Sequence, residues 1–582
     1  MVPTSLDRPW RRAGVLAYAR ARLRAFLRPP ITVYPMPSEV RMDFDVPVRM
    51  RDGVALRLNL FRPLGQEPFP VILSAHPYGK DAVPRRRLGG WKLNAQYRIM
   101  NQPEPLRISD QTSWEAPDPA WWTAQGYAVI NLDTRGGGRS EGRGDLLSDE
   151  EAADIAEVIA WAARQPWSNG RVGMLGVSYL AMSQYKVAAL NPPALKAICP
   201  WEGFTDAYRD FFNPGGVTED GFSRVWLFMT DRLARLNTKL SVERQRHLLL
   251  DNWWEAFAPD LSKITVPMLV CTSFSDANLH SGGSMRAFQR VSSQERHAYI
   301  HRGPKWSTFY GEEARQAQRT FFDRHLHERD VAPLPPVRLE IRESADKVVA
   351  VRDEQEWPLA RTNWKMLYLG NDGVLGESFR RDGQLTFDLR CDAAAFEYQF
   401  DQDTEISGPM TLTLQVAVTG TPDPRLFVGV EKWSQGVPVP FHGSYGYVRD
   451  HVAQGRLRLA LRELDLQHSA VHEPEHTFRT LQPLVDNVQV EILIPFSGSA
   501  TLFRAGDKLR LMIAGRYLQP RNPLFGHFPT HYQASRRGTA TIFWNSDRPS
   551  TLEVPVIPSS GISPHSGPLG SGTRPARHRP AA

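Results

Sequence analysis

Residues 171–189 read RVGMLGVSYLAMSQYKVAA, an apolar run that passes through Gly176 and Ser178 directly into a helix-forming run. When a strand enters a helix with almost no loop, a serine at the junction lies on a sharp turn with its hydroxyl exposed above the sheet edge. The glycine usual two residues after the serine is Leu180 here, and the small residue is Ala181. We predict that Ser178 is a catalytic nucleophile.

The sequence around this serine predicts an α/β domain. Short apolar runs alternate with helix-like segments from residue 46 to about 334. The runs are residues 69–74, 127–132, 172–175, 266–271 and 298–300. Buried strands separated by helices are typical of a parallel sheet covered on both faces. Ser148, followed by three acidic residues and an apolar helical pattern, is the predicted N-cap of the helix before Ser178.

The chain has 582 residues, more than one hydrophobic core usually covers, so we expect at least two domains. Residues 203–260 interrupt the predicted strands and predict a helical cap above the serine. From about residue 337 the pattern changes to short alternating strands, typical of an antiparallel sandwich. The predicted parts are a basic N-terminal segment (1–44), an α/β domain (45–335), a β-sandwich (336–556) and a disordered tail (557–582).

Charge and cysteine content exclude several classes of protein. The net charge is +7, but residues 1–30 contribute +6 and residues 557–582 contribute +3, which leaves residues 31–556 at −2. The folded part therefore lacks the basic surface of a nucleic-acid-binding protein. Three widely spaced cysteines, Cys199, Cys271 and Cys391, predict neither disulfides nor a cysteine metal site. A reducing, cytoplasmic location fits best, and we expect no metal or cofactor.

Two interpretations of the N-terminal segment stay open. Arginines interrupt every apolar run between residues 8 and 28, so neither a signal peptide nor a transmembrane span is predicted. We favour a helix packed on the body of the protein. The alternative is an amphipathic helix that rests on an anionic membrane surface. The oligomeric state, including a homo-oligomer, is equally open.

A nucleophilic serine needs a base and an acid, which follow it in the order Ser, Asp, His in proteins of this type. Asp276 follows the strand at 266–271 and is the predicted acid. His301 lies at the carboxyl end of the next strand, where the sites of open parallel sheets form, and is our preferred base. His280 is the rival base, but it lies only four residues after Asp276.

Several motifs in series resemble the cocaine esterase and X-Pro dipeptidyl-peptidase family. They are residues 51–56 (RDGVAL), 77–80 (PYGK), 133–142 (DTRGGGRSEG), 167–170 (WSNG) and 176–179 (GVSY). The resemblance covers about residues 45–556 and implies an α/β-hydrolase domain followed by a jelly-roll-like sandwich. It also implies that Ser178 is the nucleophile of a serine hydrolase. The Tyr78 hydroxyl and the Tyr179 backbone N–H are the implied oxyanion hole, and a phenol at a strand end is a suitable donor.

One departure from the family concerns the base. The family histidine lies in a Gly-Pro-Trp-x-His stretch, whereas this chain reads GPKWST over residues 303–308, which aligns Thr308 with that histidine. Either His301 supplies the base or the triad is incomplete. The prediction is a hydrolase that cleaves an ester or amide of a small molecule or peptide, of acyl or X-Pro dipeptidyl type. The alternative is a binding protein that kept the fold and lost the base.

Overall fold

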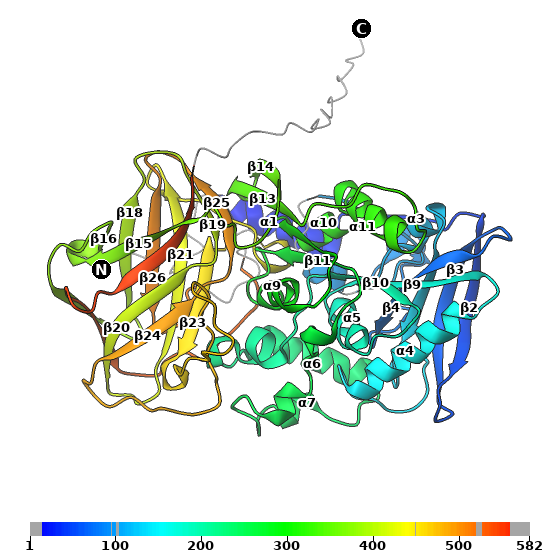
Figure 1. The fold of residues 1–582 in the computed structure, drawn as a ribbon, viewed down its shortest axis with the longest axis horizontal. Helices are drawn as coiled ribbons and strands as arrows, with labels where there is room; N and C mark the ends of the chain where they lie inside the picture. Colours follow the sequence, from blue (N-terminus) through cyan, green and yellow to red (C-terminus); the bar gives the residue numbers. More distant parts are fainter. Residues whose placement is uncertain (1–13, 95, 101–103, 448–449, 520–526, 559–582) are drawn as a thin grey trace, which may run out of the picture.

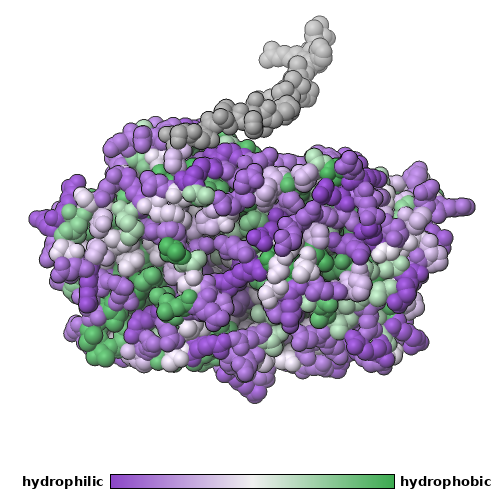
Figure 2. All heavy atoms as spheres, viewed as in Figure 1, coloured by the Kyte–Doolittle hydropathy of each residue, from purple (hydrophilic) through white to green (hydrophobic). Residues whose placement is uncertain are grey.

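The computed structural model describes residues 14–94, 96–100, 104–447, 450–519 and 527–558. The chain forms an α/β domain and an all-β domain that lie side by side (Figure 1). In the view of Figure 2 the surface is largely hydrophilic, with apolar side chains in small separate groups. Most of the predicted tail, from residue 559 onward, and the first thirteen residues lie outside the described part of the chain.

A mixed sheet forms the centre of the α/β domain. Its strands, in spatial order, are β2 (Val40–Arg49), β3 (Ala55–Pro63), β8 (Ala128–Asp133), β4 (Phe69–His76), β9 (Ser168–Val177), β10 (Leu195–Trp201), β11 (Met268–Ser273), β12 (Arg296–His301), β13 (Val337–Ser344) and β14 (Lys347–Glu354). The strands from β8 to β13 are parallel, and β2, β3 and β14 pair antiparallel with their neighbours. The carboxyl ends of the parallel strands therefore meet at one edge, where sites of such sheets form.

Helices cover both faces of this sheet, because its central strands are apolar on both sides. The helices α4 (Asp149–Ala163), α5 (Tyr179–Ala189) and α9 (Ser281–Arg290) pack on one face, and α3 (Pro119–Ala124) and α11 (Glu312–His325) pack on the other. The predicted cap of α4 is confirmed, since the Ser148 side chain accepts a hydrogen bond from the Glu151 N–H at 3.1 Å.

The insertion after β10 folds mainly as short helices over the carboxyl edge of the sheet. They are η2 (Ala207–Phe212), α6 (Phe222–Leu233), α7 (Leu240–Glu243) and α8 (Asn252–Glu255). The Trp226 indole of α6 donates a hydrogen bond to the Tyr78 hydroxyl just beyond β4, at 2.9 Å. The insertion is thereby fastened to the edge of the sheet that carries Ser178.

The all-β domain is built mainly from antiparallel strands in two groups. One contains β15 (Asn363–Gly370), β17 (Gly383–Asp388), β19 (Thr404–Gly408), β20 (Thr411–Thr419), β24 (Val490–Pro495), β25 (Ser499–Phe503), β27 (Thr539–Trp544) and β28 (Thr551–Ile557). The other contains β16 (Val374–Gly376), β18 (Ala393–Gln399), β21 (Arg425–Ser434), β22 (Val437–Pro438), β23 (Ala453–Arg458) and β26 (Lys508–Ala514). Alternate side chains of these strands share one apolar core.

The two domains are joined through β13. This strand begins just after the boundary predicted at residue 335, yet it pairs with β12 of the central sheet and contacts β25 of the all-β domain. The exact domain boundaries stay predictions. The shared strand ties the two domains together at the carboxyl side of the sheet.

The N-terminal helix α1 (Val15–Leu27) packs on the body of the protein. Its Arg22 is buried and donates hydrogen bonds to the Met100 carbonyl at 2.9 Å and to the Tyr447 hydroxyl of the all-β domain at 3.0 Å. No helix in the described ranges is long and apolar enough to span a membrane. In this structure α1 therefore contacts both the α/β domain and the all-β domain.

Candidate active site

Ser178 lies on the strained turn that the sequence predicts. It follows β9 directly, precedes α5 and has a φ of 58°, a value that residues with a side chain rarely adopt. The turn needs small neighbours. A Cβ atom added at Gly176 would lie 2.4 Å from the Leu180 Cβ, and one added at Gly203 would lie 2.6 Å from the Ala181 Cβ. The small residues let the chain turn sharply enough to present the hydroxyl.

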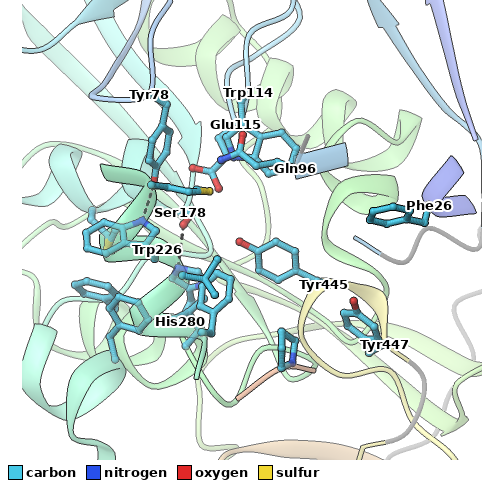
Figure 3. A pocket seen from close by; sticks show the side chains of 18 of the residues that line it. Phe26, Tyr78, Gln96, Trp114, Glu115, Ser178, Trp226, His280, Tyr445 and Tyr447 are labelled. Carbon is cyan, nitrogen blue, oxygen red and sulfur yellow. Dashed lines mark hydrogen bonds between the residues drawn. The ribbon is translucent and has the colours of Figure 1, made fainter. Parts of the chain in front are cut away.

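His280, and not His301, contacts the serine. The His280 Nε2 atom lies 3.1 Å from the Ser178 Oγ (Figure 3). The His280 Nδ1 atom lies 2.5 Å from the Asp276 Oδ2. Our placement of His301 beside Ser178 is therefore corrected by the geometry. Asp276 lies where its predicted role requires. The non-catalytic alternative assumed that no histidine reaches Ser178. Because His280 does contact Ser178, that reason for the alternative no longer holds.

The local backbone explains how His280 reaches both partners. After β11 the chain enters a helical turn in which the His280 N–H donates to the Asp276 carbonyl at 3.1 Å. Residues four apart lie on the same face of such a turn, so the carboxylate and the imidazole meet. The Phe204 ring stacks on the imidazole at 6.2 Å between centroids and restricts its orientation. The short spacing that counted against His280 in the sequence is what places it.

His301 ends β12 as predicted, but its side chain points to a different carboxylate. The Gly303 N–H donates to the His301 Nδ1 at 3.1 Å, and the His301 Nε2 lies 3.3 Å from the Glu202 Oε1. Since Nδ1 accepts a hydrogen bond, Nε2 carries the proton and faces Glu202. Thr308, at the aligned family position, donates its hydroxyl to the Pro304 carbonyl at 2.9 Å. The histidine that contacts the Ser178 hydroxyl is His280, and His301 and Thr308 hydrogen-bond elsewhere.

Glu202, Cys271 and His301 lie close enough to hold a metal ion, with their ligand atoms within 4.8 Å of one another. Their chemistry does not fit one. The His301 Nε2 carries a proton, and burial raises the pKa of the Cys271 thiol well above its usual value. Glu202 is paired with the Lys305 ammonium at 3.4 Å. These residues form a buried polar network and not a ligand set.

Of the two oxyanion-hole candidates, Tyr78 lines the same cavity as Ser178, and Tyr179 follows Ser178 directly in the chain. The Tyr78 hydroxyl accepts the Trp226 hydrogen bond, so its own proton is available to another acceptor. Burial raises the pKa of Tyr78 well above its ordinary value and keeps the phenol protonated. The Tyr179 side chain is buried against Glu151 at 2.9 Å, and the Tyr179 backbone N–H, at the start of α5, faces the Glu115 carboxyl and lowers its pKa.

Two charged residues of the site were missed by the sequence analysis. Glu115 is buried beside Ser178, and its Oε2 has no hydrogen-bond partner among the described residues. Burial raises the pKa of Glu115 to about 8, although Lys305 opposes the shift. Lys305 is buried and donates to the Asp276 Oδ2 at 2.6 Å. The sequence signal for Lys305 was the lysine in the GPKWST segment. No sequence pattern pointed to Glu115.

The site opens into a cavity of about 460 Å³ between the two domains. Figure 3 shows Ser178, Tyr78 and Glu115 on one side and Tyr445, Tyr447 and Phe26 facing them across the cavity. Most other lining residues are apolar and come from the cap, α1 and neighbouring loops. They include Leu23, Trp114, Met182, Phe204, Phe211, Phe222, Val225, Trp226, Met229 and Leu279. The all-β domain and α1 therefore complete the wall of the catalytic cavity.

Comparisons with known proteins find relatives of both domains. Residues 52–304 match the family model of X-Pro dipeptidyl-peptidase (S15 family), and residues 329–553 match the model of the X-Pro dipeptidyl-peptidase C-terminal non-catalytic domain. The cocaine esterase of Rhodococcus sp. (strain MB1 Bresler) is 27% identical over 479 residues, which cover 66% of this chain and 77% of that protein.

Solved structures extend the likeness over nearly the whole chain. A crystal structure of a CocE/NonD family hydrolase from Staphylococcus aureus is 32% identical, has a TM-score of 0.83 and covers 92% of this chain and 100% of its own. An α-amino acid ester hydrolase, 18% identical with a TM-score of 0.67 over 89% of this chain and 97% of its own, shares the fold. The predicted α/β-hydrolase fold with an all-β second domain is confirmed. The chain is a serine hydrolase that belongs to the CocE/NonD family, together with the cocaine esterase and X-Pro dipeptidyl-peptidase relatives.

Proposed function

We propose that the protein hydrolyses carboxylic esters through an acyl-enzyme on Ser178, with His280 as the general base and Asp276 as its partner. The observation that carries the proposal is the continuous contact from the Ser178 Oγ to the His280 Nε2 at 3.1 Å and from the His280 Nδ1 to Asp276 at 2.5 Å. A nucleophile, a base and a group that orients the base are the parts this chemistry requires.

The reaction follows from these contacts. The Ser178 Oγ attacks the ester carbonyl carbon while its proton passes to the His280 Nε2. Negative charge then develops on the carbonyl oxygen, where the Tyr78 hydroxyl and the Tyr179 N–H are the proposed donors. His280 returns the proton to the departing alcohol, which leaves the acyl group on Ser178. Water, deprotonated by His280, repeats the sequence and releases the carboxylic acid.

The electrostatics of the pair suit this role. Burial lowers the pKa of His280, Lys305 lowers it further, and Asp276 opposes both. The imidazole is therefore neutral at pH 7 and can accept the serine proton. Burial alone would raise the pKa of Asp276, but Lys305 and His280 outweigh it and hold the pKa well below its usual range. Asp276 stays ionised and orients the Nδ1–H of His280.

The cavity lining favours a neutral substrate with apolar groups. Aromatic and aliphatic side chains line most of the cavity, and Glu115 carries the one carboxyl among the described lining residues. Because the pKa of Glu115 is raised to about 8, this carboxyl is largely uncharged at pH 7. A dipeptide brings an ammonium group that needs a fixed counter-charge, whereas an aryl or alkyl ester does not. We therefore place neutral esters ahead of X-Pro amides.

A matched substrate panel tests the proposal. Purified protein is assayed with 4-nitrophenyl esters of increasing acyl length and with X-Pro 4-nitroanilides, in parallel with labelling by a fluorophosphonate probe. We expect ester turnover and labelling, both abolished in Ser178→Ala with a nearly unchanged melting temperature, because the substitution removes a single hydroxyl that faces the cavity. Labelling at another residue, or esterase activity that survives in Ser178→Ala, would contradict the assignment. Faster cleavage of the amides would overturn the preference for esters.

A further inference from the structure

A buried lysine contacts both the acid and the base of the site. The Lys305 Nζ lies 2.6 Å from the Asp276 Oδ2 and 3.0 Å from the His280 Nδ1. Its next contact is the Glu202 Oε2 at 3.4 Å, and the Tyr445 ring lies 5.3 Å away. All four polar residues of this cluster are buried. The lysine therefore lies on the side of the imidazole opposite the serine, where water does not screen its charge.

The lysine carries a positive charge in this position. Burial alone would lower its pKa, but Asp276 and Glu202 together raise the pKa above the ordinary value. The His280 Nδ1–H and the Lys305 ammonium then donate to the same carboxylate oxygen. Two donors 3.0 Å apart repel each other, and the repulsion grows when the imidazole gains a second proton. Lys305 thus favours the neutral form of His280.

We propose that Lys305 is a positioning residue that keeps His280 unprotonated in the resting enzyme and extends ester hydrolysis to acidic pH. The inference rests on the triad proposed above. Glu202 is its necessary counterpart. At rest, two carboxylates face one ammonium, so the cluster carries one net negative charge. When His280 takes the serine proton, two carboxylates face two cations, and the cluster becomes neutral.

Every charged or titratable group near His280 enters this balance. Asp276 precedes it on the same turn, Lys305 begins α10 (Lys305–Phe309), and Glu202 follows β10. Glu115 contributes from the loop before α3, and its effect on Lys305 is weaker than those of Asp276 and Glu202. The His301 Nε2 lies 3.3 Å from the Glu202 Oε1, on the far side of Glu202. Burial, and after it Lys305, lower the pKa of His280, and together they outweigh Asp276.

The test is the pH dependence of kcat/KM for a neutral 4-nitrophenyl ester, whose acidic limb reports protonation of the free-enzyme base. In the wild type we expect this limb below the ordinary histidine pKa of about 6.5. In Lys305→Met it should move to higher pH by at least about one unit. Lys305→Arg keeps the charge and should keep the limb near its wild-type position.

Glu202→Gln supplies a second variant with the opposite sign. It removes the counter-charge of Lys305, so the acidic limb should move to lower pH. This variant also tests the proposal if Lys305→Met does not fold. The matched control is Lys432→Met, which removes another buried, ion-paired lysine, 3.1 Å from Asp507 in the all-β domain, and should leave the limb in place.

The outcomes are distinct. An acidic limb of kcat/KM that moves to higher pH in Lys305→Met and to lower pH in Glu202→Gln supports the proposal. Unmoved limbs with lower melting temperatures show that the lysine only stabilises the fold, and they overturn it. If the proposed triad is wrong, the sign will be different: Ser178→Ala will hydrolyse the ester as fast as the wild type. A pH profile of Ser178-dependent activity therefore separates the two failures.

Discussion

Asp276 and His280 lie on one helical turn, and the imidazole Nδ1 of His280 is 2.5 Å from the Asp276 carboxylate. The proposed acid and base thus belong to one short segment after β11. Lys305 and Phe204 hold this segment from two sides. Its position relative to Ser178 is set by packing and not by a long loop.

Matched substitutions distinguish the roles of His280 and His301. His280→Ala should lower kcat by at least about 10³-fold, because among the described residues His280 supplies the imidazole in contact with the Ser178 hydroxyl. His301→Gln should keep activity within about tenfold, since an amide can still donate to Glu202. Steady-state kinetics with one activated ester measure both, with melting temperatures as the check on folding. The reverse order of effects would restore His301 as the base.

Tyr78→Phe should lower kcat by about 10²–10³-fold with little change in KM, because the lost hydroxyl acts mainly in the transition state. Tyr445→Phe is the control, as it removes the hydroxyl of another tyrosine in the same cavity and should leave kcat nearly unchanged. A raised KM at unchanged kcat in Tyr78→Phe would instead identify Tyr78 as a residue that binds the substrate.

Glu115 predicts an alkaline limit to activity. Its pKa of about 8 means that the carboxyl gains a negative charge above that pH, beside the oxygen where negative charge develops during the reaction. We expect activity to fall as the pH rises through about 8, and we expect Glu115→Gln to remove this fall. A decline of equal size and midpoint in Glu115→Gln would assign it to another group.

The same residue predicts how stability depends on pH. A carboxyl whose pKa is raised in the folded state stabilises the fold most below its unfolded pKa, and this stabilisation is lost as the pH rises through the folded value. Folding raises the pKa of Glu115 from 4.5 to about 8. The melting temperature of Glu115→Gln should therefore gain on that of the wild type between pH 5 and pH 9. A difference independent of pH would argue against a buried neutral acid.

The all-β domain should influence substrate choice. Tyr445 faces Ser178 across the cavity, and Tyr445→Ala removes an aromatic wall (Figure 3). We expect kcat/KM to fall for short acyl esters and to fall less, or rise, for bulky ones. Tyr398→Ala is the control, because this half-exposed tyrosine of the same domain lies outside the cavity lining. Equal losses for all acyl sizes would point to a general loss of stability.

The elbow and the fold were predictable because their signals are local. Ser178 needs a strand, small neighbours and a helix, and all of these stand within nineteen consecutive residues, 171–189. The buried strands of the sheet are equally easy to predict from the sequence, since they are short apolar runs. The family motifs add the order of the parts.

The position of the proposed base, His280, was not predictable in the same way. His301 satisfies the expected chain order and the strand-end position, and its ring still turns to Glu202 because the Gly303 N–H fixes its tautomer. The place of His280 depends on a helical turn that begins at Asp276, which periodicity over five residues cannot reveal. Lys305 and Glu115 matter through contacts with residues distant in the chain, which no local pattern records.

The mixed origin of the cavity wall separates two kinds of evolutionary change. Ser178, His280 and Asp276 come from the α/β domain, whereas Tyr445 and Tyr447 come from the all-β domain. Substitutions near residues 441–447 can alter which acid or alcohol is accepted while the reacting groups stay as they are. A directed library confined to that segment should therefore yield variants with new selectivity and an intact fluorophosphonate response.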